Sequence, residues 1–167
     1  AALLADSLGL PWAAIRGGLS EMHPSAKHSR GRMNKYLLPN GAIALLDFAH
    51  NPAGVSRVCQ ATAHWHAERR TLLLGHAGDR TDDDIRSLGV TVAELGLDQV
   101  ILKEMTKYQR GRPFGETREL LRQGLLGAGY PADRIIEVNT EREGVAYLLA
   151  HARPSDLVLL LVQADVD

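Results

Sequence analysis

Short apolar runs alternate with helical patterns along most of this 167-residue chain. The runs typical of buried strands cover residues 42–46, 70–75, 99–103, 135–138 and 156–162. Helical spacing or capping signals fill the segments between them, at 52–68, 82–96, 116–126 and 140–151. Strands that alternate with helices through short links form a largely parallel sheet covered on both faces. The predicted fold class is therefore α/β.

The strand predicted at 42–46 ends in a carboxylate, Asp47. Asn51 and Pro52 follow as a possible N-cap and first residue of the next helix. Ligand sites of parallel sheets lie outside the carboxyl ends of the strands. We therefore expect Asp47, His50 and the first amides of that helix to share one rim of the sheet. Before this strand, Asn40-Gly41 predicts a turn from a short strand at 35–38.

Charged residues follow the next two predicted strands as well. The run at 70–75 leads into Gly78, Asp79 and Arg80, and Thr81 then begins a helix whose first residues are aspartates. Acidic residues there compensate the helix dipole, which is a better explanation than cation binding. The run at 99–103 ends in Lys103 and a long polar loop.

Composition excludes several classes of function. The 45% hydrophobic content is enough for a core, and 19 basic against 20 acidic residues favour neither nucleic acid nor an anionic membrane as a partner. The single cysteine, Cys59, rules out an internal disulfide and is interpreted as a buried structural thiol. The N-terminus has no signal-peptide pattern, and a cytoplasmic location is expected.

Two further patterns are negative. His64 and His66 are two residues apart in a predicted helix and so point to different sides, and no metal site is expected from them. The chain also has no Gly-x-x-x-x-Gly-Lys-Ser/Thr phosphate loop. Short helices are predicted at 1–8 and 12–17, before a linker-like stretch at 20–30.

Four motifs in fixed order resemble one family. They are Gly31-Arg32-Met33-Asn34, the run Asp47-Phe48-Ala49-His50-Asn51-Pro52, Gly78-Asp79-Arg80, and Arg110-Gly111-Arg112. Together they resemble the C-terminal domain of the Mur ligase superfamily, and among its members they are most similar to the cyanophycin synthetases. The resemblance implies a Rossmann-like three-layer domain at residues 30–167. Residues 1–29 would be a helical remnant of a preceding central ATPase domain and its linker.

The resemblance also implies an activity and a set of site residues. The reaction is ATP-dependent amide bond formation through an acyl phosphate. In the resembled family Asp47 would bind the ribose of ATP, and Arg32, His50 and Asn51 would help to close the nucleotide site. For the incoming amino acid, aspartate in the most similar members, the residues are Arg110, Arg112 and Lys103. Gly78, Asp79 and Arg80 would shape the loop between the two regions.

The same family keeps its Mg²⁺ ligands and phosphate loop in the central domain. No catalytic residue is assigned within this chain, which we expect to be inactive alone. The implied partners are the nucleotide, the amino acid, a peptide or polymer acceptor, and the N-terminal and central domains of the same polypeptide.

Other interpretations stay open at this point. Asp47 and Arg32 form a buried ion pair in one of them, and Arg110 and Arg112 are solvated loop charges in another. A peptidoglycan or folylpolyglutamate ligase domain fits the same family. A non-catalytic nucleotide-binding or interaction module, and a phosphatase with Asp47 as nucleophile, represent other classes.

Overall fold

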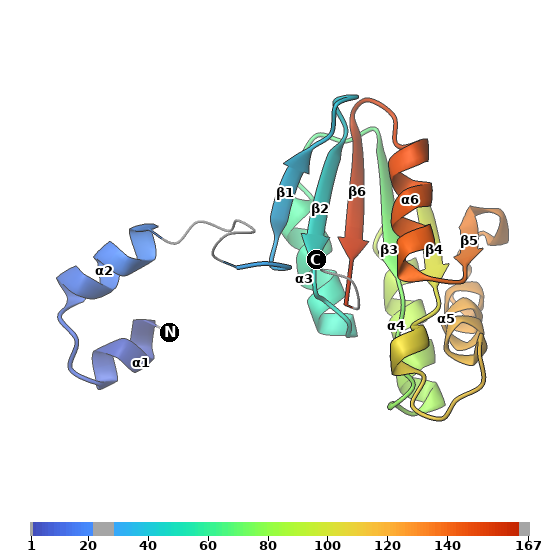
Figure 1. The fold of residues 1–167 in the computed structure, drawn as a ribbon, viewed down its shortest axis with the longest axis horizontal. Helices are drawn as coiled ribbons and strands as arrows, with labels where there is room; N and C mark the ends of the chain where they lie inside the picture. The colour runs from blue at the N-terminus through green and yellow to red at the C-terminus, as the bar shows by residue number, and fades with distance from the viewer. Residues whose placement is uncertain (1, 22–28, 164–167) are drawn as a thin grey trace.

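The computed structural model describes residues 2–21 and 29–163, in which six strands form one sheet (Figure 1). The strands are β1 (Asn34–Leu37), β2 (Ile43–Asp47), β3 (Arg69–Leu74), β4 (Gln99–Lys103), β5 (Ile135–Val138) and β6 (Asp156–Leu161). Their order across the sheet is β1-β2-β6-β3-β4-β5. Only the β1–β2 pair of this sheet is antiparallel. The predicted α/β class with a largely parallel sheet is confirmed.

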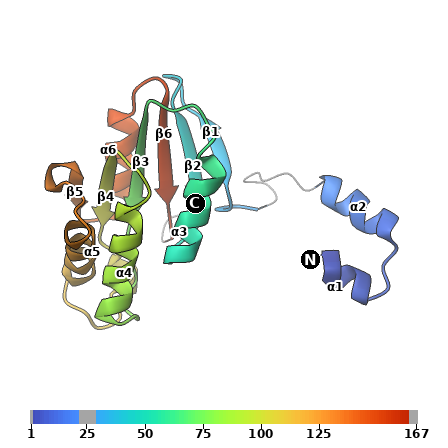
Figure 2. The ribbon, with the colours of Figure 1, turned by 180° about the vertical axis from the view of Figure 1, so that it is seen from behind.

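Helices cover the two faces of the sheet unequally (Figures 1 and 2). The helices of the sheet domain are α3 (Pro52–Thr62), α4 (Asp82–Ala93), α5 (Glu116–Gly127) and α6 (Glu141–His151), with short 3-10 turns at Thr106–Tyr108 and Ala132–Arg134. The connections through α3, α4 and α5 advance across the sheet in one direction, whereas α6 leads back to β6. Because parallel crossovers are right-handed, the returning helix lies on the opposite face.

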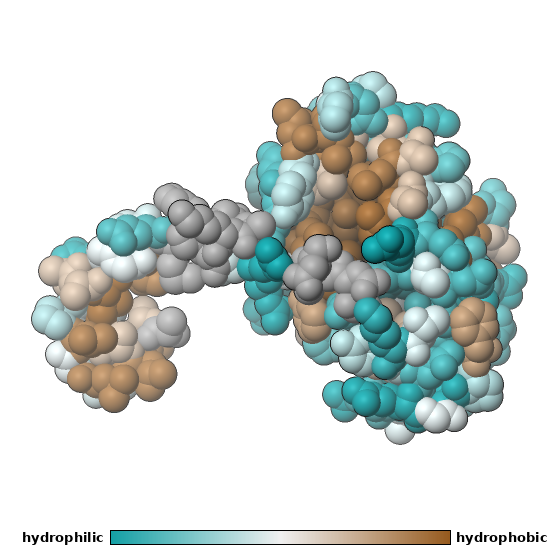
Figure 3. All heavy atoms as spheres, in the orientation of Figure 1, coloured by the Kyte–Doolittle hydropathy of each residue, from teal (hydrophilic) through white to brown (hydrophobic). Residues whose placement is uncertain are grey.

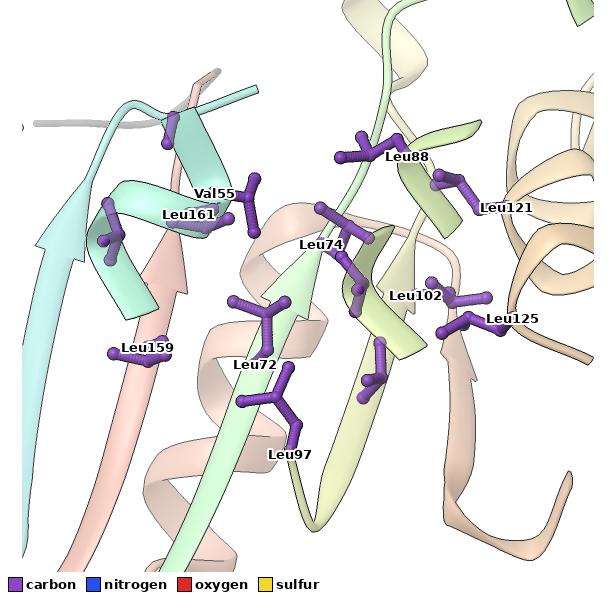
Figure 4. Packing of buried hydrophobic residues seen from close by; sticks show 14 of the residues in the cluster. Val55, Leu72, Leu74, Leu88, Leu97, Leu102, Leu121, Leu125, Leu159 and Leu161 are labelled. Carbon is purple, nitrogen blue, oxygen red and sulfur yellow. The ribbon is translucent and has the colours of Figure 1, made fainter. Parts of the chain in front are cut away.

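The larger hydrophobic cluster lies between the sheet and the three helices α3, α4 and α5 (Figure 4). Val55, Leu88 and Leu121 contribute one side chain from each helix, and none of them is exposed. They face strand residues such as Leu72 and Leu102. Full burial of a side chain of this size stabilises the fold by about 1.5–3 kcal/mol. A second cluster lies on the α6 face.

Helix α3 is shorter than the sequence predicts. It ends at Thr62 rather than near residue 68, and the Thr62 hydroxyl donates to the Val58 carbonyl oxygen at 3.0 Å. The Arg70 guanidinium donates to the carbonyl oxygens of Thr62, Ala63 and Trp65, which satisfies groups that a continuing helix would use. His64 and His66 therefore follow the helix. Among the described residues, no cluster of three or more His, Cys, Asp or Glu side chains suits a metal.

Two N-terminal helices, α1 (Ala2–Ser7) and α2 (Trp12–Glu21), pack against each other (Figure 1). The second extends past the predicted end at residue 17. Large apolar side chains are exposed on this pair, among them Leu3 at 80% and Leu4 at 65%, and the space-filling view shows the resulting apolar surface (Figure 3). Residues 22–28 of the predicted linker lie outside the described ranges. Within those ranges no helix has the length and apolarity needed to cross a bilayer.

Candidate functional site

The strands β2, β6 and β3 end at the same edge of the sheet (Figure 1). Two adjoining cavities are lined by residues that follow β2 and β3 at this edge. The β2–α3 cavity has a volume of about 370 Å³, and its wall includes Arg32, Asp47, Phe48, His50, Asn51 and Arg57. The β3–β4 cavity has a volume of about 210 Å³, and its wall includes Phe48, His50, His76, Asp79, Arg80 and Arg110. Phe48 and His50 line both, so they form a shared wall.

Asp47 lies in the wall of the β2–α3 cavity with 6% of its surface exposed. Its Oδ1 accepts a hydrogen bond from the Ala49 amide at 2.8 Å, and its Oδ2 accepts one from the Met33 amide at 2.9 Å. Met33 has a φ of 51°, an uncommon conformation for a residue other than glycine. Each carboxylate oxygen has two lone pairs, so both oxygens can also accept from a ligand hydroxyl.

Arg32 is exposed at the rim of the same cavity. Its guanidinium lies 5.4 Å from the centroid of the Phe48 ring, and that ring meets His50 edge to face at 5.8 Å. Within the described chain, Arg32 and Asp47 form no ion pair, so that interpretation is wrong. The exposed guanidinium is placed to meet a ligand anion.

Asn51 is the N-cap of α3, as the sequence predicts. Its Oδ1 accepts from the Gly54 amide at 2.8 Å, and Pro52 occupies the start of the helix. The β2–α3 cavity runs along the side of α3 past Gly54 and Arg57, and the amino end of the helix at Asn51 forms part of its wall, where the helix dipole favours negative charge.

The β3–β4 cavity brings together charges from two loops. Asp79 and Arg80 follow β3, and Arg110 follows β4 with its guanidinium 5.5 Å from the Tyr108 ring. Arg110 has a φ of 53°, so a second left-handed residue lies at this edge of the sheet. Sequence reasoning missed His76, a buried wall residue whose Nδ1 lies 2.6 Å from the Ala77 carbonyl oxygen. The available signal was its position two residues after β3 ends.

Arg112 does not line either cavity and instead joins two loops. Its Nη1 forms ion pairs with Asp82 and Glu116, both at 2.7 Å. Its Nε donates to the Gly78 carbonyl oxygen and its Nη2 to the Arg80 carbonyl oxygen. The carboxylates raise the pKa of this guanidinium further above its ordinary value. These contacts argue against the predicted contact of Arg112 with an amino-acid substrate.

Lys103 also differs from the prediction. Its side chain has no exposed surface and forms an ion pair with Glu141, which is 4% exposed. A strand residue whose charge is buried in this way cannot reach a substrate directly, so the prediction that Lys103 contacts the amino acid is corrected. Alternation of the side chains along β4 places Lys103 on the α6 face of the sheet together with Ile101, so its ammonium group meets Glu141 at the start of α6.

Comparison with known proteins identifies the family to which this chain belongs. A family model described as "Mur ligase, glutamate ligase domain" matches residues 31–161. The chain belongs to the Mur ligase family. A cyanophycin synthetase of Synechocystis sp. is 40% identical over 134 residues, which cover 78% of this chain and 15% of that relative. The chain thus spans about a sixth of the length of the curated relatives of this kind.

Solved structures show the same fold. The MurC ligase of Thermotoga maritima has a TM-score of 0.67 at 16% identity, with 98% of this chain and 33% of that one covered. A folylpolyglutamate synthase of Mycobacterium tuberculosis, complexed with ADP, has a TM-score of 0.60 at 20% identity, with 90% and 32% covered. The Mur ligase fold therefore extends across the described sheet domain.

Proposed function

We propose that this chain is the closing domain of an ATP-dependent amino-acid ligase of the cyanophycin synthetase type. The observation that carries the proposal is the pair of adjoining cavities with one shared wall, at the edge where parallel sheets bind ligands. A ligase of this kind must hold a nucleotide and an amino acid side by side, and two cavities that meet at Phe48 and His50 suit that requirement.

The β2–α3 cavity is the proposed nucleotide site. The Asp47 carboxylate accepts from vicinal ribose hydroxyls, for which both of its oxygens keep acceptor capacity. Arg32 and His50 contact the phosphates, and Asn51 holds the helix start whose dipole favours them. The presence of ADP in a related folylpolyglutamate synthase supports a nucleotide role for this family.

The β3–β4 cavity is the proposed amino-acid site. Arg110 is exposed there and binds a substrate carboxylate, while Asp79 binds the substrate ammonium group. Gly78 and Arg112 act on this site indirectly, through the shape of the loops. Aspartate is the proposed substrate because the identity to a cyanophycin synthetase reaches 40%.

The reaction forms an amide bond through an acyl phosphate. ATP transfers its γ-phosphoryl group to an acceptor carboxylate, the amine of the amino acid attacks the acyl carbon, and phosphate leaves. Mg²⁺ neutralises the transferring phosphoryl group, and its ligands belong to a central domain. Residues 1–29 are proposed to belong to that central domain and its linker, since exposed leucines on α1 and α2 require an apolar partner.

Calorimetric titration of the chain with Mg-ADP and with aspartate tests the proposal. We expect weak binding of each ligand and a roughly tenfold loss of nucleotide affinity in Arg32→Met. Lys35→Met is the matched control, because Lys35 is also exposed and lies over an aromatic ring, at 4.8 Å from the Trp65 centroid. Lys35→Met should leave ADP binding unchanged, since Lys35 does not line the β2–α3 cavity.

Two results would contradict the proposal. Equal losses in Arg32→Met and Lys35→Met would mean that charge alone attracts the nucleotide. Binding of neither ligand, even when the chain is supplied with a central domain of a related ligase, would favour a non-catalytic interaction module. Preference for diaminopimelate or glutamate over aspartate would instead favour a peptidoglycan or folylpolyglutamate ligase domain.

A further inference from the structure

A buried polar network connects β4, α6 and β6 next to the β3–β4 cavity. Lys103, the last residue of β4, donates to Glu141 at the start of α6, to the Leu161 carbonyl oxygen at the end of β6, and to Gln163 Oε1 at 2.9 Å. An ammonium group has three protons to donate, and these three acceptors match them. The network therefore fixes where the side chain of Gln163 lies.

Gln163 connects the buried network to the wall that the two cavities share. Its Nε2 donates to the Ala49 carbonyl oxygen at 3.0 Å, and its backbone amide donates to Glu141 Oε2 at 2.9 Å. Ala49 lies between Phe48 and His50, the two residues that line both cavities. We call residues 48–50 the wall turn. Its central carbonyl group is thus bonded to a side chain that Lys103 and Glu141 hold.

The side chain of Lys103 packs against Gly75, where only glycine leaves enough space for it. A Cβ atom there would lie 2.8 Å from Lys103 Cγ and 2.9 Å from Lys103 Cε, closer than normal packing allows. Gly75 and Gln163 both line the β3–β4 cavity. The lysine stem therefore packs directly beneath the cavity, where its charge would be costly without the Glu141 carboxylate.

We propose that Lys103 is a positioning residue that acts through Gln163 to fix the wall turn. The ligand part of this inference rests on the proposed function. The structural part does not, because it concerns only the conformation of residues 48–50. Lys103 was expected from the sequence to contact the substrate, and in this proposal it controls the substrate sites without reaching either of them.

Nuclear magnetic resonance of the whole chain without ligand tests the structural part. We expect Gln163→Met and Gln163→Glu both to shift the amide signals of Ala49 and His50 and to speed exchange of the Ala49 amide about tenfold. Glutamate keeps an acceptor for Lys103 but cannot donate to the Ala49 carbonyl oxygen, so it isolates that bond. Gln123→Met is the matched control, because Gln123 is exposed on α5.

Lys103→Met tests the same turn from the other end of the network. It is expected to shift the same signals although Lys103 does not contact the turn. Should that variant fail to fold, the two Gln163 variants still decide the question, because they keep the Lys103–Glu141 pair. Unchanged Ala49 and His50 signals in folded Gln163 variants would overturn the proposal.

Titration with Mg-ADP then tests the ligand part. A fivefold or greater loss of affinity in the Gln163 variants, with a melting temperature close to that of the original chain, supports positioning. Unchanged affinity together with shifted wall-turn signals overturns the ligand part. If the original chain itself does not bind ADP, the proposed nucleotide site fails, and the amide signals alone decide whether Lys103 fixes the turn.

Discussion

The Nε atom of Arg112 donates a hydrogen bond to the carbonyl oxygen of Gly78 at 3.0 Å. This bond joins the loop after β4 to the loop after β3, and the Gly78 amide returns a bond to the Tyr108 carbonyl oxygen at 2.9 Å. The two loops therefore form one unit. Asp79, Arg80 and Arg110, which line the β3–β4 cavity, are carried by that unit.

Arg112→Met is expected to lower the free energy of unfolding by about 2 kcal/mol, because charge-assisted hydrogen bonds and ion pairs are lost together. Arg110→Met is the matched control, since the Arg110 guanidinium contacts the Tyr108 ring and is exposed. Its effect on stability stays within about 0.5 kcal/mol. Urea denaturation measures both, and a reversed order would contradict the assigned roles.

Aspartate binding should distinguish Arg110 from Arg112 in the opposite order to stability. Arg110→Met should abolish the proposed aspartate binding without changing the fold. Arg112→Met should weaken aspartate binding only because the loops after β3 and β4 become less ordered. Lowering the temperature should therefore restore part of the affinity. Calorimetry at two temperatures makes the comparison. Full aspartate binding in Arg110→Met would remove that residue from the proposed site.

Gly78→Ala should destabilise the chain by about 3 kcal/mol, as expected for a severe steric overlap. A Cβ atom at this position would lie 2.0 Å from the Gln109 carbonyl oxygen, which belongs to the backbone and cannot turn aside. Gly127→Ala serves as the control, because a Cβ atom there meets nothing within 4 Å. It should raise stability by about 0.5 kcal/mol in a helical residue.

Stability should fall between pH 9 and pH 11 because of Cys59. Burial raises the pKa of this thiol from its ordinary value of 9.0 to about 11, so in this range the unfolded chain loses a proton that the folded chain keeps. Cys59→Ala should flatten the fall in urea titrations. At pH 8 the folded thiol should react with iodoacetamide about 100-fold more slowly than the unfolded one, because less thiolate is present. Equal rates would mean that the thiol is accessible.

Removal of residues 1–28 should leave the sheet domain folded. The packing partner of α1 is α2, and among the described residues neither helix contributes to the hydrophobic clusters of the domain. Calorimetry should therefore give a melting temperature within a few degrees of that of the whole chain. A large fall would contradict the proposed domain boundary.

The sequence predicts the elements better than their arrangement. Every strand is predicted near its observed position, and the caps at Asn51, Thr81 and Thr140 are visible as short polar signals before helices. The insertion of β6 between β2 and β3 is not visible, because an apolar run indicates burial but not its neighbours. The early end of α3 depends on Arg70, which acts from outside the helix.

In the candidate site, too, the sequence predicts which residues are present better than how they are arranged. The charges at the ends of the strands were predicted, since their positions follow from the parallel topology. The difference between Arg110, which lines a cavity, and Arg112, which joins two loops, was not predictable from the pattern Arg-Gly-Arg. The sequence does not indicate that Lys103 is buried, because its partner Glu141 is 38 residues away along the chain.

The position of β6 has a consequence for biosynthesis. Residues 34–47 and 69–138 supply strands that leave the ribosome before β6, yet β2 and β3 contact each other only through it. A nascent chain can therefore form a hairpin and a separate three-stranded sheet, but the hydrogen bonds that join them into one sheet require β6. The edge that carries both cavities is therefore complete only after β6 has paired with β2 and β3.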